Sequence, residues 1–203
     1  TKVESGATHT CTLMDDGGIM CWGRDNTGQL GNGGTSDTIY SPSTNVELPE
    51  GRAATDLSVG DHHSCALLDN GSVACWGQNN HGQLGDNTTT NAPIPVYAHL
   101  PMNSVAVSVS AGPYSSFAVL ENSSVYCWGH NNYGRLGIGV SGGVYPAPMF
   151  VEQANNVVVL SLNYDHTCAL SENGSISCWG RNKHGQLGIG QSGDRNTPNL
   201  IDY

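Results

Sequence analysis

Residues 166–190 read HTCALSENGSISCWGRNKHGQLGIG, and the chain repeats this stretch three more times with few changes. The related stretches are HTCTLMDDGGIMCWGRDNTGQLGN from His9, HSCALLDNGSVACWGQNNHGQLGD from His63, and SSFAVLENSSVYCWGHNNYGRLGIG from Ser115. Their shared Cys-Trp-Gly tripeptide recurs at intervals of 54, 52 and 51 residues. A period of this size indicates a propeller, a solenoid or another repeat array.

The interior of each repeat is typical of β-structure, because it shows no sustained helical spacing of apolar residues. Short β-rich runs are cut by Gly, Asn and Asp. We expect a first strand (105–110, 157–162), a hairpin (64–68 with 72–76), a loop (77–85) and a last strand (95–98, 148–152). Four strands per unit is the content of one propeller blade. The sequence therefore predicts an all-β domain over residues 1–203, a β-propeller of four-stranded antiparallel blades with repeats near 1–56, 57–108, 109–160 and 161–203.

The hairpin register predicts three disulfides. With residues 69–71 as a three-residue loop and Gly71 in the left-handed conformation, Cys65 lies directly opposite Cys75. Directly opposed residues at a non-hydrogen-bonded position are close enough for a disulfide. The loops 15–17 and 172–174 give the same register, so the predicted pairs are Cys11–Cys21, Cys65–Cys75 and Cys168–Cys178.

The third repeat leaves one cysteine over, because Phe117 stands where the other repeats have a first cysteine. Cys127 is then unpaired within its own blade. We expect a buried thiol packed on Phe117, since free cysteine behaves as a small hydrophobe. An intermolecular link is the alternative.

Both faces of the predicted hairpin are apolar, whereas a sheet with one solvated face alternates apolar and polar residues. Leu67 and Val73 share a face with the cystine. The other face carries Ala66, Leu68, Ala74 and Trp76. This pattern indicates a blade wedged between two neighbouring blades.

The run C-W-G-x-N-x-x-G-Q-L-G, preceded by H-[TS]-C-A-L and an N-G turn, resembles the repeats of the regulator-of-chromosome-condensation family over almost the whole chain. The resemblance implies a β-propeller, usually of seven blades with repeats of roughly 50 residues. Arg135 stands in the Gln position of repeat 3, and Asp25 in the first Asn position of repeat 1. We interpret the signature as scaffold, with glycines for turns and leucines that plug the loop into the core: Trp22, Trp76, Trp128, Trp179, Gly28, Gly82, Gly134, Gly185, Leu30, Leu84, Leu136 and Leu187.

Charge and cysteines separate this chain from the founding member of the family it resembles, a nuclear exchange factor for a small GTPase that docks on chromatin. The formal net charge is −10, from 17 acidic and 7 basic residues, which disfavours nucleic acid as a partner. Disulfides persist in oxidising compartments. The chain is more similar to secreted and cell-surface members, so we expect an extracellular or cell-surface location. No apolar run approaches the about 20 residues of a membrane helix.

No pattern indicates catalysis, a metal or another cofactor. The chain has no G-x-S-x-G, Walker or H-E-x-x-H motif. His9, His63 and His166 share one repeat position, and His81 and His184 another. Propeller symmetry could gather them into a metal ring, but repetition also fits a structural role, which we favour. The paired cysteines lie too far apart in sequence for a zinc knuckle, and the Asp/Asn runs near 85–90 and 193–196 fit no calcium loop.

Four N-x-[ST] sequons occur, at Asn70, Asn87, Asn122 and Asn173. Three of them fall at the same hairpin tip, where Asn-Gly-Ser is also a good turn sequence. Asn122 keeps its sequon without the glycine. After passage through a eukaryotic secretory pathway, glycans are expected foremost at Asn122 and Asn87.

These observations favour a non-enzymatic extracellular binding or scaffold module for proteins or carbohydrates. The alternatives are a structural subunit of an extracellular filament or coat, and a regulator or inhibitor of an enzyme or small GTPase. Function on repeat scaffolds resides in variable loops. We expect contacts from loops 33–46, 88–96 and 141–148, which carry Tyr40, Thr89 and Tyr145.

Four repeats fall short of a seven-bladed ring, which needs roughly 350 residues at this period. Unclosed blades would expose two apolar faces and two strand edges, which invite association. We expect part of a longer propeller, then a filament, then a compact four-bladed ring, in that order; the short segments at both chain ends fit an incomplete set.

Overall fold

The computed structural model describes residues 1–35, 38–49 and 51–202, and it contains four separate four-stranded sheets. Blade 1 contains β1 (Lys2–Ser5), β2 (His9–Leu13), β3 (Ile19–Arg24) and β4 (Thr38–Asn45). Blade 2 contains β5 (Ala54–Val59), β6 (His63–Leu68), β7 (Val73–Gly77) and β8 (Ala92–Tyr97). Blade 3 contains β9 (Ala106–Ala111), β10 (Ser115–Leu120), β11 (Val125–His130), the short 3₁₀ turn η1 (Asn132–Gly134) and β12 (Val144–Phe150). Blade 4 contains β13 (Val157–Leu162), β14 (His166–Ser171), β15 (Ile176–Gly180) and β16 (Arg195–Leu200).

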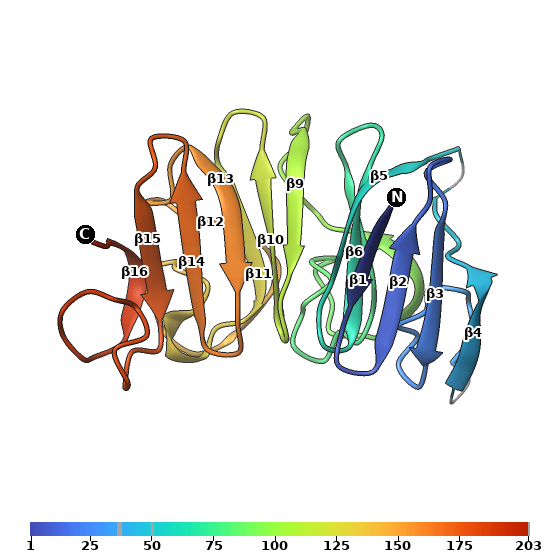
Figure 1. Ribbon diagram of the computed structural model, residues 1–203, viewed down its shortest axis with the longest axis horizontal. Coiled ribbons are helices and arrows are strands. Elements are labelled where there is room, and N and C mark those ends of the chain that lie inside the picture. Colours follow the sequence, from blue (N-terminus) through green and yellow to red (C-terminus); the bar gives the residue numbers. More distant parts are fainter. Residues whose placement is uncertain (36–37, 50, 203) are drawn as a thin grey trace.

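The four blades stand side by side as an arc, with blade 1 and blade 4 at its two ends (Figure 1). Within each blade the strands follow chain order and pair antiparallel. Packing contacts join β1 and β2 to β5, β5 and β6 to β9, and β9 and β10 to β13. The all-β propeller prediction is confirmed, and among the described residues no helix is long and apolar enough to cross a membrane.

The hairpin register is the one predicted from the sequence. Cys65 pairs with Cys75 across β6 and β7, and Gly71 has a φ of +76°. The three cystines join Cys11 to Cys21, Cys65 to Cys75 and Cys168 to Cys178. In the third hairpin Ser123 takes the glycine's place with a φ of +65°.

Cys127 is a fully buried free thiol opposite Phe117. Its Sγ lies 3.2 Å from the Leu136 carbonyl, and burial raises the pKa of the thiol well above its ordinary value. A buried neutral thiol is a poor nucleophile, so this arrangement fits the packing role favoured by the sequence.

The glycine of each Cys-Trp-Gly tripeptide marks an irregularity between the third and fourth strands. The register shifts between the cysteine and this glycine in all four blades. Gly77 has a φ of +103°, and a Cβ there would stand 2.7 Å from the His62 carbonyl oxygen. The close approach of the preceding turn therefore requires glycine at this position.

The last strands begin earlier than expected. β8 starts at Ala92 rather than residue 95, and β12 at Val144 rather than residue 148. Each contains two prolines, of which Pro93 and Pro146 fall in the segment that the sequence assigned to the leading loop, whereas Pro95 and Pro148 were expected to begin the strands. Each is the outer strand of its sheet, where a missing N–H on the free edge costs no ladder hydrogen bond.

The hydrophobic core is divided into three layers, one between each pair of consecutive blades. Blade 2 shows how the strand pattern serves this arrangement, because every residue of β6 and β7 is buried. Ala66, Leu68, Ala74 and Trp76 pack toward blade 1, and Cys65, Leu67, Val73 and Cys75 pack toward blade 3. The prediction of two apolar faces is confirmed.

The residues that recur in the loop after each third strand stabilise that loop by hydrogen bonds and burial. The Asn79 side chain accepts a hydrogen bond from the Leu84 N–H at 2.9 Å, and Asp25 does the same for Leu30 at 3.0 Å. The four signature leucines are fully buried: Leu30, Leu84, Leu136 and Leu187. Gly28, Gly82, Gly134 and Gly185 all have positive φ angles.

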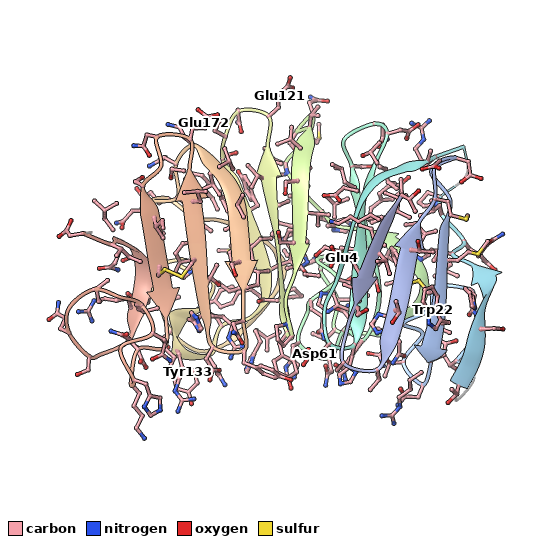
Figure 2. The ribbon with its side chains drawn as sticks, in the orientation of Figure 1. Glu4, Trp22, Asp61, Glu121, Tyr133 and Glu172 are labelled. Carbon is pink, nitrogen blue, oxygen red and sulfur yellow. A yellow bond between two sulfur atoms is a disulfide. The ribbon has the colours of Figure 1, made fainter. Side chains whose placement is uncertain are left out.

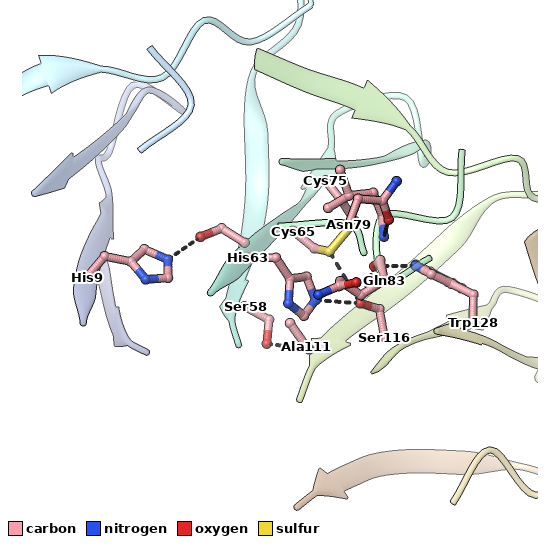
Figure 3. The surroundings of a disulfide bond; sticks show 12 residues. His9, Ser58, His63, Cys65, Cys75, Asn79, Gln83, Ala111, Ser116 and Trp128 are labelled. Carbon is pink, nitrogen blue, oxygen red and sulfur yellow. Dashed lines mark hydrogen bonds between the residues drawn. A yellow bond between two sulfur atoms is a disulfide. The ribbon is translucent and has the colours of Figure 1, made fainter. Parts of the chain in front are cut away.

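Hydrogen bonds also cross between blades. The indole N–H of Trp76 donates to the Gln29 carbonyl of blade 1 at 3.1 Å. Trp128 repeats this bond to the Gln83 carbonyl at 2.8 Å (Figure 3). Trp179 repeats it to the Arg135 carbonyl, also at 2.8 Å.

Candidate binding face at one end of the blades

The two ends of the blades differ in charge. The tips of the second-to-third-strand hairpins carry acids, among them Glu121 and Glu172 at the upper end of Figure 2. The opposite end, where Asp61 and Tyr133 lie in that view, holds the first turns and the G-Q-L-G loops. Five of the seven basic residues of the chain lie at that end: Arg24, Arg135, Arg181, Lys183 and Arg195. On a chain of net charge −10, this end is the place where an acidic partner is least repelled.

At this end of the blades, Arg135 joins blade 3 to blade 4. Its side chain is only 3% exposed, and its Nη2 donates to Asp165 Oδ1 at 3.0 Å. In the other repeats a glutamine at this position accepts a hydrogen bond from the loop backbone, as Gln83 does from the His81 N–H. An arginine has no acceptor, so repeat 3 directs the side chain to blade 4 instead. Burial lowers the pKa of Arg135, and Asp165 opposes that shift.

Asp165 links two arginines. Its Oδ1 accepts from Arg135, and its Oδ2 accepts from Arg181 Nη1 at 2.8 Å. The Arg181 guanidinium lies over the Tyr133 ring, 4.7 Å from the ring centroid. Tyr133 has a φ of +60° inside η1, an uncommon conformation for a bulky residue. The η1 loop therefore has a left-handed backbone conformation at Tyr133, the residue whose ring makes this cation–π pair.

Aromatic rings continue the cluster across blades 2, 3 and 4. The rings of His81 and His130 stack with centroids 4.7 Å apart, and Tyr114 meets His81 edge-on at 5.2 Å. Tyr114 also meets Tyr164 at 5.9 Å. The Tyr164 hydroxyl donates to Asp61 of blade 2 at 2.5 Å. Burial, then the Arg135 charge, lower the pKa values of His81 and His130, which favours neutral stacked rings.

We call this set the aromatic–arginine face; it consists of Asp61, His81, Tyr114, His130, Tyr133, Arg135, Tyr164, Asp165 and Arg181. Tyr133 is 37% exposed and Tyr164 51% exposed, so two phenol rings are offered to solvent. Tyr164 and Asp61 also border an open hollow of about 470 Å³ where the first turns of all four blades meet. Tyrosine and arginine, which this face gathers, are residue types enriched at protein interaction surfaces.

The histidines divide between scaffold and face. His9 and His63 are buried, and their Nε2 atoms lie 2.8 Å from Ser64 Oγ and Ser116 Oγ (Figure 3). Burial lowers the pKa of His9 to about 4 and that of His63 to about 3. Their structural interpretation fits these contacts. Within residues 1–35, 38–49 and 51–202, His, Cys, Asp and Glu side chains form no group of three suited to a metal ion.

The loops expected to make contacts lie outside this face. Thr89 is exposed in the loop before β8, but Tyr145 belongs to β12 and packs partly against the core between blades 3 and 4. Residues 92–96 and 144–148 are strand, so those two contact loops are shorter than expected. Tyr40 lies in β4, and its side chain is outside the described part of the chain.

The sequon asparagines are all exposed. Asn70, Asn122 and Asn173 lie at the hairpin tips, the end opposite the aromatic–arginine face. Each side-chain oxygen accepts from the backbone N–H and hydroxyl of the serine two residues on. Asn87 has a φ of +64° in the loop before β8. Glycosylation at these sites stays a prediction.

Sequence reasoning missed the cluster because its members do not share one repeat position. The available signal was departure from the repeat, namely Arg135 in place of glutamine and a tyrosine at 114 and 164 in the first turns. Comparing repeats for what differs between them would have pointed to blades 3 and 4.

The sequence profile of the RCC1-like domain matches residues 1–203. The chain is 30% identical over 201 residues to the ultraviolet-B receptor UVR8 of Arabidopsis thaliana, which covers 98% of this chain and 45% of that protein. The chain thus spans less than half the length of this curated relative.

Two solved structures show the same fold. Human WBSCR16 superposes with a TM-score of 0.85 at 22% identity, covering all of this chain and 53% of that one. Prp20p from Saccharomyces cerevisiae gives a TM-score of 0.83 at 21% identity, covering all of this chain and 50% of that one.

Proposed function

The chain belongs to the RCC1-like domain family, and from that premise we propose that it is a non-enzymatic module that binds a protein through the aromatic–arginine face. The observation that carries the proposal is Arg135. It replaces the glutamine of the repeat, is almost fully buried, and joins blade 3 to blade 4 through Asp165. A scaffold residue would follow the repeat, whereas this one breaks it and positions the exposed rings.

The proposed partner presents acidic and apolar groups to this face. Tyrosine and arginine are the residues that most often dominate binding energy at protein interfaces. The Arg181 guanidinium on Tyr133 is already oriented by Asp165, so little side-chain entropy is lost when a partner carboxylate binds. This end repels an acidic surface less than the hairpin-tip end does, because most basic residues of the chain lie here and the hairpin tips carry acids.

We further propose that the module works outside the cell. Support comes from the three cystines, which need an oxidising compartment to persist. Intact-mass measurement of natively produced protein, alkylated under denaturing conditions without reduction, should find one reactive thiol, that of Cys127. Seven reactive thiols would contradict both the cystines and the proposed location.

A comparison of binding profiles tests the face. The wild type and the double variant Tyr164→Ala/Arg181→Ala are immobilised and exposed to extracellular proteins of the source, which are then quantified by mass spectrometry. The matched control is Glu121→Gln/Glu172→Gln at the hairpin tips. We expect at least one acidic protein to be lost only with the Tyr164/Arg181 variant, and then to bind purified wild type at least tenfold more tightly than that variant.

Equal retention of every captured protein by all three samples would refute a binding role for this face. Loss with the hairpin-tip variant alone would move the binding surface to the opposite end. If the chain still binds glycans that have been released from the captured proteins, in a sample from which the proteins were removed, the partner would be a carbohydrate and not a protein.

A further inference from the structure

The packing between blades 3 and 4 leaves a hollow of about 300 Å³ at the end of the blades where the hairpin tips lie. One wall is the segment 153–157, which joins the two blades, and the other is the β14–β15 hairpin around Glu172 (Figure 2). Both walls belong to consecutive blades, so this blade 3–4 hollow lies within the arc and not at either of its end faces. Its volume is at the lower end of the about 300–1,000 Å³ typical of small-molecule sites.

The hollow is open because blade 4 departs from the repeat at two positions. Ser171 stands where blades 2 and 3 have Leu68 and Leu120, which are 1% and 3% exposed in the core layers. Ser177 stands where blade 3 has Tyr126, which packs partly against the core. At the equivalent place between blades 2 and 3, which Leu120 lines, the hollow measures about 120 Å³. The short side chains of blade 4 therefore leave the space that larger ones fill in the neighbouring blade.

Hydrogen bonds fix the two walls to each other. The Ser171 hydroxyl donates to the Asn155 carbonyl at 3.0 Å, and the Glu172 N–H donates to the Asn156 carbonyl at 2.9 Å. A ligand would meet walls that are already ordered, so its binding costs little conformational entropy of the protein.

Three polar side chains of the walls make no hydrogen bond within the described part of the chain. They are the half-buried hydroxyl of Ser177 and the amide groups of Asn155 and Asn156. Ala169 and Trp179, both buried, line the apolar inner side of the hollow. A polar space of this size does not stay empty, because water or a ligand with matching groups fills it.

Charge restricts the class of ligand. Glu172 is the only charged side chain among the described residues that line the hollow, and it is exposed. With no cation on the walls, a phosphate or carboxylate ligand would lack the charged donors that such groups need. Amide and hydroxyl groups both donate and accept hydrogen bonds, as the hydroxyl groups of a neutral sugar require. The apolar inner side matches the C–H groups of a sugar ring.

We propose that the blade 3–4 hollow binds one neutral sugar ring, with its hydroxyl groups bonded to Asn155, Asn156 and Ser177 and its C–H groups packed on the apolar inner side. The ring is either a free monosaccharide or the terminal residue of a glycan, since both present the same chemistry. The site lies at the end of the blades opposite the aromatic–arginine face, so it is independent of the protein binding proposed there.

Saturation-transfer NMR tests the proposal with free glucose, galactose, mannose and N-acetylglucosamine as probes. The 203-residue chain is secreted into a bacterial periplasm, which allows its cystines to form and leaves the Asn173 sequon unmodified. At least one probe should show transfer from the wild type. Ser171→Leu restores the leucine of blades 2 and 3 and fills the hollow, so it should abolish the signal while the midpoint of urea unfolding stays unchanged or rises. Ser177→Ala keeps the hollow and removes one hydroxyl, so it should weaken binding about fivefold, the loss expected for one neutral hydrogen bond.

Ser161→Leu, at an exposed position of β13 outside the hollow, is the matched control that should bind the probe as the wild type does. Tighter binding of a glycan that ends in the same sugar would identify the glycan as the source of the ring, and equal affinity would identify the free sugar. No transfer from the wild type to any of the probes would overturn the proposal and leave water as the content of the hollow. Binding that survives Ser171→Leu would also overturn it, because the sugar would then be bound elsewhere.

Discussion

Replacing Trp76 with phenylalanine is expected to destabilise the fold more than the same change at Trp128, although both rings are fully buried. The Trp76 indole donates to the Gln29 carbonyl at 3.1 Å, and the Trp128 indole to the Gln83 carbonyl at 2.8 Å. The second carbonyl also accepts from Ser116 Oγ at 2.9 Å. Within the described residues the first carbonyl has the indole alone.

The magnitude follows from this difference. Each replacement removes one hydrogen bond, worth about 0.5–1.5 kcal/mol, and the same ring volume. Trp76→Phe also leaves a buried carbonyl unpaired, which costs about 1–3 kcal/mol. We therefore expect the free energy of unfolding to fall by about 1–3 kcal/mol more for Trp76→Phe than for Trp128→Phe.

Urea unfolding with the cystines intact measures the difference. Far-UV circular dichroism and intrinsic fluorescence should give coincident transitions. Trp179→Phe is a second matched case, because the Arg135 carbonyl also accepts from Thr167 Oγ1 at 2.9 Å, so it should behave like Trp128→Phe. Equal destabilisation at residues 76 and 128 would refute the hydrogen-bond accounting.

Further outcomes are expected. Gly77→Ala should cost more than about 2 kcal/mol in urea unfolding, because its φ is +103° and the new Cβ would press on a backbone carbonyl; unchanged stability would contradict the observed approach. Replacing Cys65 and Cys75 together by alanine should cost about 3 kcal/mol, since the bridge closes a short loop between residues 10 apart, and a midpoint equal to wild type would show that the bridge adds nothing. The pKa of His63 is lowered to about 3 in the fold, so the unfolded chain binds the proton first and stability should fall as the pH drops below about 6.5. Between pH 7.5 and 5 the His63 contribution is about 2 kcal/mol, so the His63→Asn variant, which keeps His9, should lose about 2 kcal/mol less stability than the wild type over this range. Arg135→Gln should change the free energy of unfolding by no more than about 1 kcal/mol and yet lose the partner identified by the profile comparison; retained binding would remove Arg135 from the face.

Much of the fold could be predicted from the repeat. The three-residue hairpin loop fixes which residues face each other, so the Cys65–Cys75 register needed no tertiary information. The last strands β8 and β12 start before the residues predicted from the sequence. Proline is acceptable only on the free edge of a sheet, and which strand lies at the edge is a property of the assembled sheet.

The sequence by itself determined the blade: its four strands, its cystine and the two apolar faces that require neighbours on both sides. Only the tertiary structure brought Asp61, Tyr114, Arg135 and Tyr164 together, because they come from turns of three blades and up to 103 residues apart. Local periodicity reports what each repeat shares, whereas the aromatic–arginine face is made of what the repeats do not share. Its assembly depends on how consecutive blades are packed, which only side-chain contacts across their interfaces decide.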